Sequence, residues 1–289
     1  MNPGFSVYGV ATGLLEPGDD IVGRVIAAVG DTEAERICDR DILLFAESPL
    51  STTEGRNIRL ADITPGENAR ALAEKYDLDP RVAEIVIAES DEILGGIPGF
   101  LLAARGNLVL PNAGVDESNA PDGWVTRLPE DADASAARIR KEIRERTGKE
   151  VAVIIIDSRT HAMRLGVSGV AIGCSGILPI TDERGKPDLF GHELQVTRRA
   201  IADSLASTAE LLMGEADEGV PVVLVRGYPY TFAENTTIES IAPDEDLFLG
   251  SLTKKVGGGL TQCEGRSLRQ YPQMRRQGIR PVPGSGRRC

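Results

Sequence analysis

Apolar positions along the chain recur with two different periods, which predicts a mixture of strands and amphipathic helices. The longest apolar run, Val151 to Ile156, is typical of a strand that is buried on both faces of a sheet. Helical spacing is clear in 133–147, where Ile139 and Ile143 share one face and Gly148 ends the pattern. The same patterns predict further strands at 5–10, 41–45, 99–104, 107–110, 167–172 and 220–226, and further helices at 18–29, 66–76, 80–94 and 193–213.

The order of these elements lacks the regular strand–helix–strand rhythm of a parallel sheet. It favours an α+β fold, with two intercalated subdomains of mixed or antiparallel sheet and packed helices, over a doubly wound sheet. A chain of 289 residues can bury a sizeable core. No apolar run approaches the roughly 20 residues of a membrane span, and the first residues do not resemble a secretory signal, so we expect a cytoplasmic protein.

Charge divides the chain into an acidic body and a basic end. From Lys254 onward there are nine Lys or Arg and one Glu, a charge of +8, so the preceding residues carry −12 − 8 = −20. A body this acidic repels nucleic acid. We therefore expect a catalytic domain over 1–253 and a basic, disordered tail over 254–289, which either binds anionic partners or is an extension without function.

Cysteine and histidine offer little chemistry. The four cysteines are scattered without a CxxC pair, and neither histidine stands at ligand spacing, which disfavours a disulfide scaffold and a zinc site. No base accompanies Cys174, so a nucleophilic role has little support. His161 and His192 could act as general bases, but a surface position suits His192 better, at the expected start of a helix.

Two aspartates are the strongest candidates for chemistry. Asp157 follows the apolar run of the buried strand, and Asp116 follows a second apolar stretch that ends at Pro111. Two carboxylates at strand ends, with the hydroxyl of Ser158 beside them, suit a divalent metal that holds a phosphate. The alternative is that each aspartate simply caps the turn in which it lies.

Three other segments have weaker signals. Gly214 to Gly219 could bring backbone N–H groups to a phosphate, with Glu215 as a third acidic ligand, or it could be a solvated turn. Residues 171–176 form a small-residue pattern that predicts a loop after a strand. Arg164 could pair with a phosphate or form a surface ion pair.

Several segments together resemble the coenzyme F420-0:γ-glutamyl ligase family over about residues 5–227. The most specific are Asn-Ala-Gly-Val-Asp-Glu-Ser-Asn at 112–119 and Leu-Met-Gly-Glu at 212–215. The other matching segments are Gly18-Asp-Asp20, Glu54-Gly55-Arg56, Asp157-Ser158, 171–176, 188–194 and Val225-Arg-Gly227.

The resemblance implies a homodimeric enzyme that uses GTP to add L-glutamate to the carboxylate of F420-0, through an acyl phosphate. It implies two Mg²⁺ or Mn²⁺ ions per subunit, with K⁺ as a further candidate cation. Asp116 and Asp157 would be the catalytic residues and would hold one metal, and Ser158 and Glu215 would help to hold the second. The nucleotide would contact Ala11, Thr12, Gly13, Ser48, Asn119, Gly214, Asp217 and Gly219.

The chain departs from the family pattern where cations are expected. Thr52 replaces a lysine that would meet nucleotide phosphate, and Glu47 adds a negative charge nearby. Thr160-His161 replaces Gly-Arg, and Leu165 replaces the second of two paired arginines. Two alternatives to the F420-0 ligase therefore stay open: a paralogue that uses another acid, amine or nucleotide, and a non-catalytic protein that binds the deazaflavin or a nucleotide.

Overall fold

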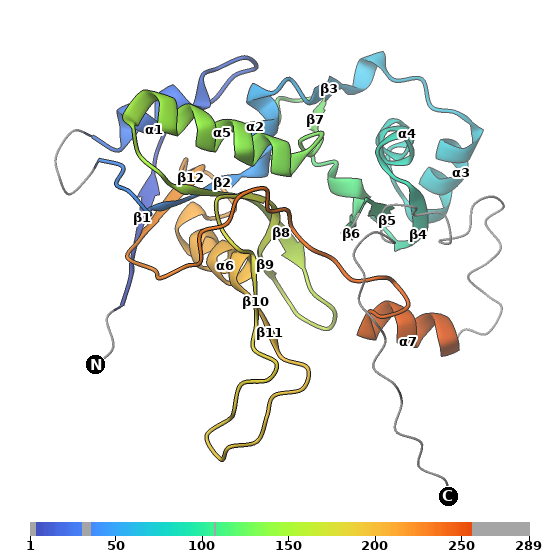
Figure 1. The fold of residues 1–289 in the computed structure, drawn as a ribbon. Coiled ribbons are helices and arrows are strands. Elements are labelled where there is room, and N and C mark those ends of the chain that lie inside the picture. Colours follow the sequence, from blue (N-terminus) through green and yellow to red (C-terminus); the bar gives the residue numbers. More distant parts are fainter. Residues whose placement is uncertain (1–3, 31–35, 107, 256–289) are drawn as a thin grey trace, which may run out of the picture. The chain divides into compact units, whose positions relative to one another are not determined.

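The computed structural model describes residues 4–30, 36–106 and 108–255. The chain divides into two compact units, residues 1–239 and 240–289 (Figure 1). Within the second unit, α7 (Leu247–Lys255) begins where the Asp246 carboxylate accepts hydrogen bonds from the backbone N–H groups of Phe248 and Leu249. Almost all of the basic tail lies outside the described residues, and its boundary and disorder stay predictions.

A five-stranded sheet forms the centre of the first unit, in the order β1-β12-β2-β8-β9. Its strands are β1 (Ser6–Val10), β12 (Val222–Arg226), β2 (Ile42–Ala46), β8 (Ala152–Thr160) and β9 (Val167–Ser175). β2 and β8 run parallel, and the other neighbours run antiparallel. The expected α+β class with mixed sheet is confirmed, whereas intercalated subdomains and a homodimer stay predictions.

Helices cover both faces of this sheet, as Figure 1 shows. Leu43 and Phe45 of β2 face α1 (Ile21–Ala28) and α5 (Ala132–Thr147) in one core. Ile42 and Leu44 face α6 (Ile201–Met213) in a second core. Successive side chains of a strand point to opposite faces, so a strand covered on both sides must be apolar throughout.

A second lobe of the first unit has its own core. It contains α3 (Glu67–Tyr76), α4 (Pro80–Glu89), and the antiparallel strands β4 (Glu92–Ile97), β5 (Phe100–Arg105) and β6 (Leu108–Pro111). Two short helical turns, η1 (Leu60–Asp62) and η2 (Asn112–Gly114), and the pair β3 (Asn57–Arg59) and β7 (Trp124–Thr126) complete it.

Two expected helices are too long. α4 ends at Glu89, and Glu92 onward pairs with β5, so the helix predicted to residue 94 is wrong in its last residues. The helix predicted over 193–213 begins only at Ile201, because β11 (Arg198–Ala200) pairs with β10 (Ile180–Asp182) in a hairpin arm. In both places pairing with the following or preceding strand of a hairpin overrides a helical spacing.

The segment 171–176 is not a loop, contrary to the prediction, because β9 continues to Ser175. Its glycines allow close packing of backbones. A Cβ atom on Gly173 would lie 2.3 Å from the carbonyl carbon of Ala132, and one on Gly169 would lie 2.4 Å from the carbonyl oxygen of Ala206. Glycine in this strand therefore marks helix contact.

The sequence missed a helix directly after β2. α2 (Glu47–Thr53) begins with Glu47 in its first turn, where a carboxylate is favoured by the helix dipole. β8 is also longer than expected. It continues past Asp157 to Thr160, with a bulge between Ile155 and Ile156.

Candidate active site

The candidate segments lie at one edge of the five-stranded sheet, where β2 and β8 have their carboxyl-terminal ends. β2 and β8 run parallel, so Glu47 and Asp157 directly follow the paired residues Ala46 and Ile156 at the same edge. β12 begins at this edge, because the backbone N–H of Ala46 donates to the carbonyl of Pro221 at 2.9 Å. β1 ends beside the first residues of β12. Sheet topology therefore brings together residues from four separate parts of the sequence.

Asp157 is the central carboxylate of this edge. Its side chain is 14% exposed and accepts a hydrogen bond of 3.0 Å from the Arg159 guanidinium. Burial raises the pKa of Asp157, the charge and hydrogen bond of Arg159 oppose that rise, and the charges of Asp116 and Glu215 add to it. The three carboxylates expected as metal ligands therefore lie close enough to repel one another.

Glu47 is a member of this group that the sequence did not identify as a site residue. Burial and the neighbouring charge of Asp157 raise the pKa of Glu47 to about 8, against a hydrogen bond from the Ser48 hydroxyl. Its position follows from the parallel pairing of β2 and β8, which no local pattern reveals.

Glu210 is a second acidic residue that the sequence missed. It lies near the end of α6, where burial and a hydrogen bond shared with Glu215 raise the pKa of Glu210 to about 8. Its Oε2 atom is buried and has no hydrogen-bond partner among the described residues. We call Glu47, Asp116, Asp157, Glu210 and Glu215 the acid cluster.

Asp116 reaches the acid cluster from the loop after η2. Its backbone pairs with Thr126 through hydrogen bonds of 2.8 and 2.9 Å. Its side chain accepts hydrogen bonds from the backbone and hydroxyl of Ser118. The turn-capping alternative for Asp116 is therefore true, and it coexists with a position near Asp157.

The residues expected to contact a nucleotide lie in three segments. Ala11, Thr12 and Gly13 follow β1, where the Thr12 hydroxyl donates to the Gly13 carbonyl at 3.1 Å. Ser48 donates to Glu47, as described above. Asn119 is exposed in the loop after Asp116 and has a positive φ of 52°.

The third segment connects α6 to β12. Gly214 and Gly219 have φ values of 70° and 66°, a conformation that favours glycine. The Glu218 carboxylate folds back to accept a hydrogen bond of 2.9 Å from the backbone N–H of Ala216. Asp217 is exposed. The segment is a glycine-hinged acidic turn at the edge that holds Asp157.

The donor chemistry of the acid cluster fits a hard divalent cation, since it consists of carboxylate oxygens with little compensating charge. Among the described residues, Arg159 is the only cation in an ion pair with the cluster. Ser158 is exposed beside Asp157, so its hydroxyl could complete a ligand set. In the described part of the chain, however, no three Asp, Glu, His or Cys side chains converge into a ready-made metal site. Side chains would therefore have to turn toward a bound ion.

The structure also shows the surroundings of the four remaining candidates from the sequence, two histidines, one cysteine and one arginine. Burial raises the pKa of the Cys174 thiol to about 12, which makes it a poor nucleophile. His161 lies 2.7 Å from the Ser168 hydroxyl across the β8–β9 hairpin. His192 is not at a helix start, contrary to the prediction, and instead lies beside Asp188 in the arm. Arg164 is exposed.

The family model described as F420-0:Gamma-glutamyl ligase matches residues 9–227. The chain is 44% identical over 229 residues to the coenzyme F420:L-glutamate ligase of Methanothermobacter thermautotrophicus, covering 78% of this chain and 90% of that protein. It is 45% identical over 214 residues to the protein of the same name from Methanopyrus kandleri, covering 74% and 82%. None of the described helices has the length and apolar character of a membrane span.

Proposed function

The chain belongs to the F420-0:gamma-glutamyl ligase family, and from that premise we propose that it joins L-glutamate to coenzyme F420-0 by an amide bond in F420 biosynthesis. Its relatives in Methanothermobacter and Methanopyrus carry the name coenzyme F420:L-glutamate ligase. The similarity extends over most of each of those proteins, and the range matched by the family model, 9–227, spans the acid cluster.

The observation that supports a ligase mechanism best is the charge of the acid cluster. Burial raises the pKa of Glu47, Asp157 and Glu210, and the charges of neighbouring carboxylates in the cluster raise these values further. Such repulsion costs folding free energy, and bound cations would remove it. We propose that Asp116, Asp157, Ser158 and Glu215 hold two Mg²⁺ or Mn²⁺ ions.

A carboxylate is a poor acylating agent, so it must first be activated by phosphorylation. The phosphate donor is a highly charged triphosphate, and the cations are needed to offset its charge. We propose that a carboxylate oxygen of F420-0 attacks the γ-phosphorus of GTP, which gives an acyl phosphate and GDP. The amine of L-glutamate then attacks the acyl carbon, which forms the amide and releases phosphate. Bound Mg²⁺ or Mn²⁺ would offset the charge of the triphosphate and of the departing diphosphate.

The residues of the chain supply position rather than covalent chemistry in this proposal. The glycines at 214 and 219 would let backbone N–H groups approach the phosphates, and 11–13 would line the same sheet edge. Asp116 and Asp157, held on separate elements, would fix the ions between the triphosphate and the substrate carboxylate.

A second nucleotide stays a candidate because of Thr52. Its hydroxyl donates to the Asn57 side chain at 3.2 Å, so the position contributes a neutral group where the family pattern has lysine. Another nucleotide, or another acid or amine, would make the chain a paralogue with the same mechanism.

We also propose that the enzyme is a homodimer. The arm between β10 and β11 exposes large apolar side chains, with Leu189 100%, Phe190 86% and Val196 84% accessible. Apolar groups this exposed are typical of a surface that a partner covers. Light scattering should give twice the mass of one chain, and replacement of Phe190 and Leu189 by Glu should give monomers.

The test of the proposed function is an assay with purified F420-0, L-glutamate and GTP, in which Mg²⁺, Mn²⁺ and K⁺ are added singly and together. The expected products are glutamylated F420-0 with equimolar GDP and phosphate. Chelation of the divalent ion should stop their formation. Turnover with ATP but not GTP would identify the paralogue. Tight binding of F420-0 with no product under any condition would contradict a ligase.

A further inference from the structure

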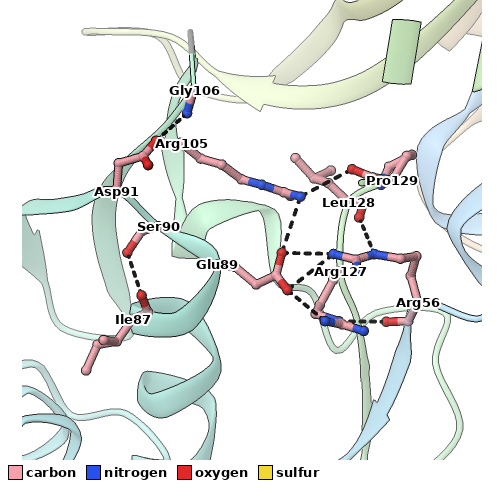
Figure 2. Close-up of polar contacts among 10 residues, drawn as sticks. All are labelled: Arg56, Ile87, Glu89, Ser90, Asp91, Arg105, Gly106, Arg127, Leu128 and Pro129. Carbon is pink, nitrogen blue, oxygen red and sulfur yellow. Dashed lines mark hydrogen bonds and ion pairs between the residues drawn. The ribbon is translucent and has the colours of Figure 1, made fainter. Parts of the chain in front are cut away.

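Three arginines surround one glutamate in the second lobe, in an arrangement shown in Figure 2. Glu89 is the last residue of α4. Its carboxylate oxygens form ion pairs with guanidinium nitrogens of Arg127 at 2.8 Å, Arg56 at 2.9 Å and Arg105 at 3.2 Å. We call these four residues the arginine cluster. They come from four separate segments, so the fold alone brings them together.

The guanidinium groups are fixed by the backbone as well as by Glu89 (Figure 2). The Arg56 Nε atom donates to the Leu128 carbonyl at 2.9 Å, and the Arg105 Nη2 atom donates to the Pro129 carbonyl at 3.2 Å. The Arg127 Nε atom donates to the Arg56 carbonyl at 3.1 Å. Their geometry is therefore set before any ligand arrives, which lowers the entropic cost of binding.

Within the arginine cluster positive charge exceeds negative charge, and Asp91 is a further carboxylate whose charge acts on Arg105. Three guanidiniums and one carboxylate leave a charge of +2, and the four side chains are only 13–21% exposed. Burial lowers the pKa of Arg105, and the charges of Arg56 and Arg127 lower it further, against the attraction of Glu89. The strain falls mainly on Arg105.

Several donors of the arginine cluster have no acceptor. The Arg105 Nη1 atom is buried without a hydrogen-bond partner in the described part of the chain. Nη1 of Arg56 and Nη2 of Arg127 form no hydrogen bond with the described residues, but they are not buried and water can reach them. A cluster with spare donors and spare positive charge is complementary to an oxyanion.

The arginine cluster is connected to the candidate active site through the residue that pairs with Asp116. Arg127 directly follows Thr126, whose backbone pairs with Asp116. Neighbouring Cα atoms are about 3.8 Å apart and paired strands about 5 Å apart, so the Cα atoms of Arg127 and Asp116 lie within roughly 9 Å. A small substrate could extend between the two sites.

We propose that the arginine cluster is an oxyanion site that binds a carboxylate of the amino-acid substrate. This assignment rests on the proposed ligase function, which requires L-glutamate to be held by its carboxylates while its amine stays free. Planar, paired N–H groups match a carboxylate in two-point contacts, and the acidic surroundings of the rest of the body make this cluster the natural place for an anion. Phosphate shares the chemistry and is the competing ligand.

The first test measures binding without turnover. Thermal unfolding of the metal-free protein is followed with L-glutamate, with L-glutamine, with inorganic phosphate, and with NaCl at matched ionic strength. At about ten times its dissociation constant, L-glutamate should raise the unfolding midpoint by about 3–6 °C beyond NaCl. A larger shift with phosphate than with L-glutamate would overturn the assignment to the amino acid, and no shift beyond NaCl would overturn the site.

Variants locate the effect. Arg105→Met should abolish the L-glutamate shift and leave the midpoint without ligand unchanged or higher, because it removes a strained charge. Glu89→Gln should enlarge the shift, because it frees three guanidiniums for the ligand. Arg70→Met, which removes an exposed arginine on α3 of the same lobe, is the matched control and should behave as the unchanged protein. An L-glutamate shift that survives in Arg105→Met would overturn the proposal.

Steady-state kinetics separate this proposal from the ligase function. In an active enzyme, Arg105→Met should raise the KM for L-glutamate roughly tenfold or more, with kcat within about twofold, as expected for the loss of a charge-assisted contact. An unchanged KM would overturn the arginine site and leave the ligase function standing. A protein that binds L-glutamate through Arg105 but makes no product would refute the ligase function and leave the site standing.

Discussion

The acid cluster and the arginine cluster are opposite in charge and alike in being unbalanced. The first has five carboxylates and one guanidinium, a charge of −5 + 1 = −4 when all are ionised, and the second has a charge of +2. A structural ion pair in the same molecule behaves differently: Asp41 and Arg226 neutralise each other through contacts of 2.7 and 2.9 Å. Two unbalanced sites in one fold therefore indicate places for ligands of opposite sign, a cation and an oxyanion.

The two clusters differ in how they can relieve their charge. Carboxylates can take up protons, and Glu47 and Glu210 do so near pH 8. Guanidiniums stay charged at every pH at which the protein is folded. The acid cluster therefore has two ways to reach neutrality, protonation or metal, whereas the arginine cluster can only bind an anion.

The largest expected effect comes from removing one carboxylate from the acid cluster. Asp116→Asn and Asp157→Asn keep the shape of the side chain and delete the charge that would hold a cation. Each should lower metal-dependent turnover by ~10²–10³-fold, the size seen when one group that stabilises developing charge is lost. Turnover is measured as GDP release, and circular dichroism checks the fold.

Asp62→Asn is the control for these variants, because Asp62 is exposed on η1 in the second lobe. It should retain full activity. Near-normal rates in both Asp116→Asn and Asp157→Asn would remove the acid cluster from the mechanism and end the comparison between the two sites.

The next largest effect concerns folding and comes from the arginine cluster. Glu89→Gln removes the carboxylate that three largely buried guanidiniums share, which should lower the free energy of unfolding by roughly 3 kcal/mol. Arg105→Met removes one of the excess charges and should change it by less than about 1 kcal/mol. Urea unfolding at matched salt measures both, and equal losses in the two variants would show that the cluster is a purely structural clamp.

Protonation gives a third comparison. The pKa of Glu47 is about 8 in the folded protein, and its ordinary value is 4.5. Between pH 4.5 and pH 8, the folded state therefore keeps a proton on Glu47 that the unfolded chain has lost. Stability contributed by this group is therefore lost as pH rises from 4.5 through 8. Between pH 6 and pH 8, Glu47 should account for a loss of about 2 kcal/mol of unfolding free energy in the metal-free protein, and Glu210, whose pKa is also raised to about 8, adds to that loss.

Two controls assign that loss. Glu47→Gln should remove the share of the loss that Glu47 contributes and leave the share of Glu210, because only residue 47 no longer ionises. Saturating Mn²⁺ should flatten the dependence on pH, since a bound cation favours the ionised form. Metal-free protein that is as stable at pH 8 as at pH 6 would show that Glu47 is not held in a repulsive site.

Local patterns in the sequence predicted much of the fold and named Asp116, Asp157 and Glu215 as candidates for the first site, whereas no pattern indicated the arginine cluster. The apolar run at 151–156 and the helix at 133–147 are confirmed because burial on both faces and a single buried face leave clear periods. Ile201 marks the true start of α6, since pairing of 198–200 with β10 is a long-range event that spacing does not record.

The sequence did not identify several site residues, and the reason is the same. Glu47 joins Asp157 through the parallel pairing of β2 with β8, and Glu210 meets Glu215 through the end of α6. Arg105 and Glu89 are ordinary surface residues as far as the sequence shows, and only the packing of α4 against β5 brings them together. Sequence identifies chemistry within a segment, and the fold decides which segments share a site.

The smallest expected effect comes from adding a positive charge to α2, the helix that begins at Glu47. Thr52 lies in the last turn of α2, and its side chain contacts only Asn57 among the described polar groups. Thr52→Lys should tighten GTP binding about threefold, the gain expected for one partly screened charge pair, whereas Thr52→Met, of similar length without charge, should not. Fluorescence titration with a labelled GTP analogue measures both. Equal affinity in the two variants would mean that another cation already meets the phosphate, and Arg159, which pairs with Asp157, would be the first to replace.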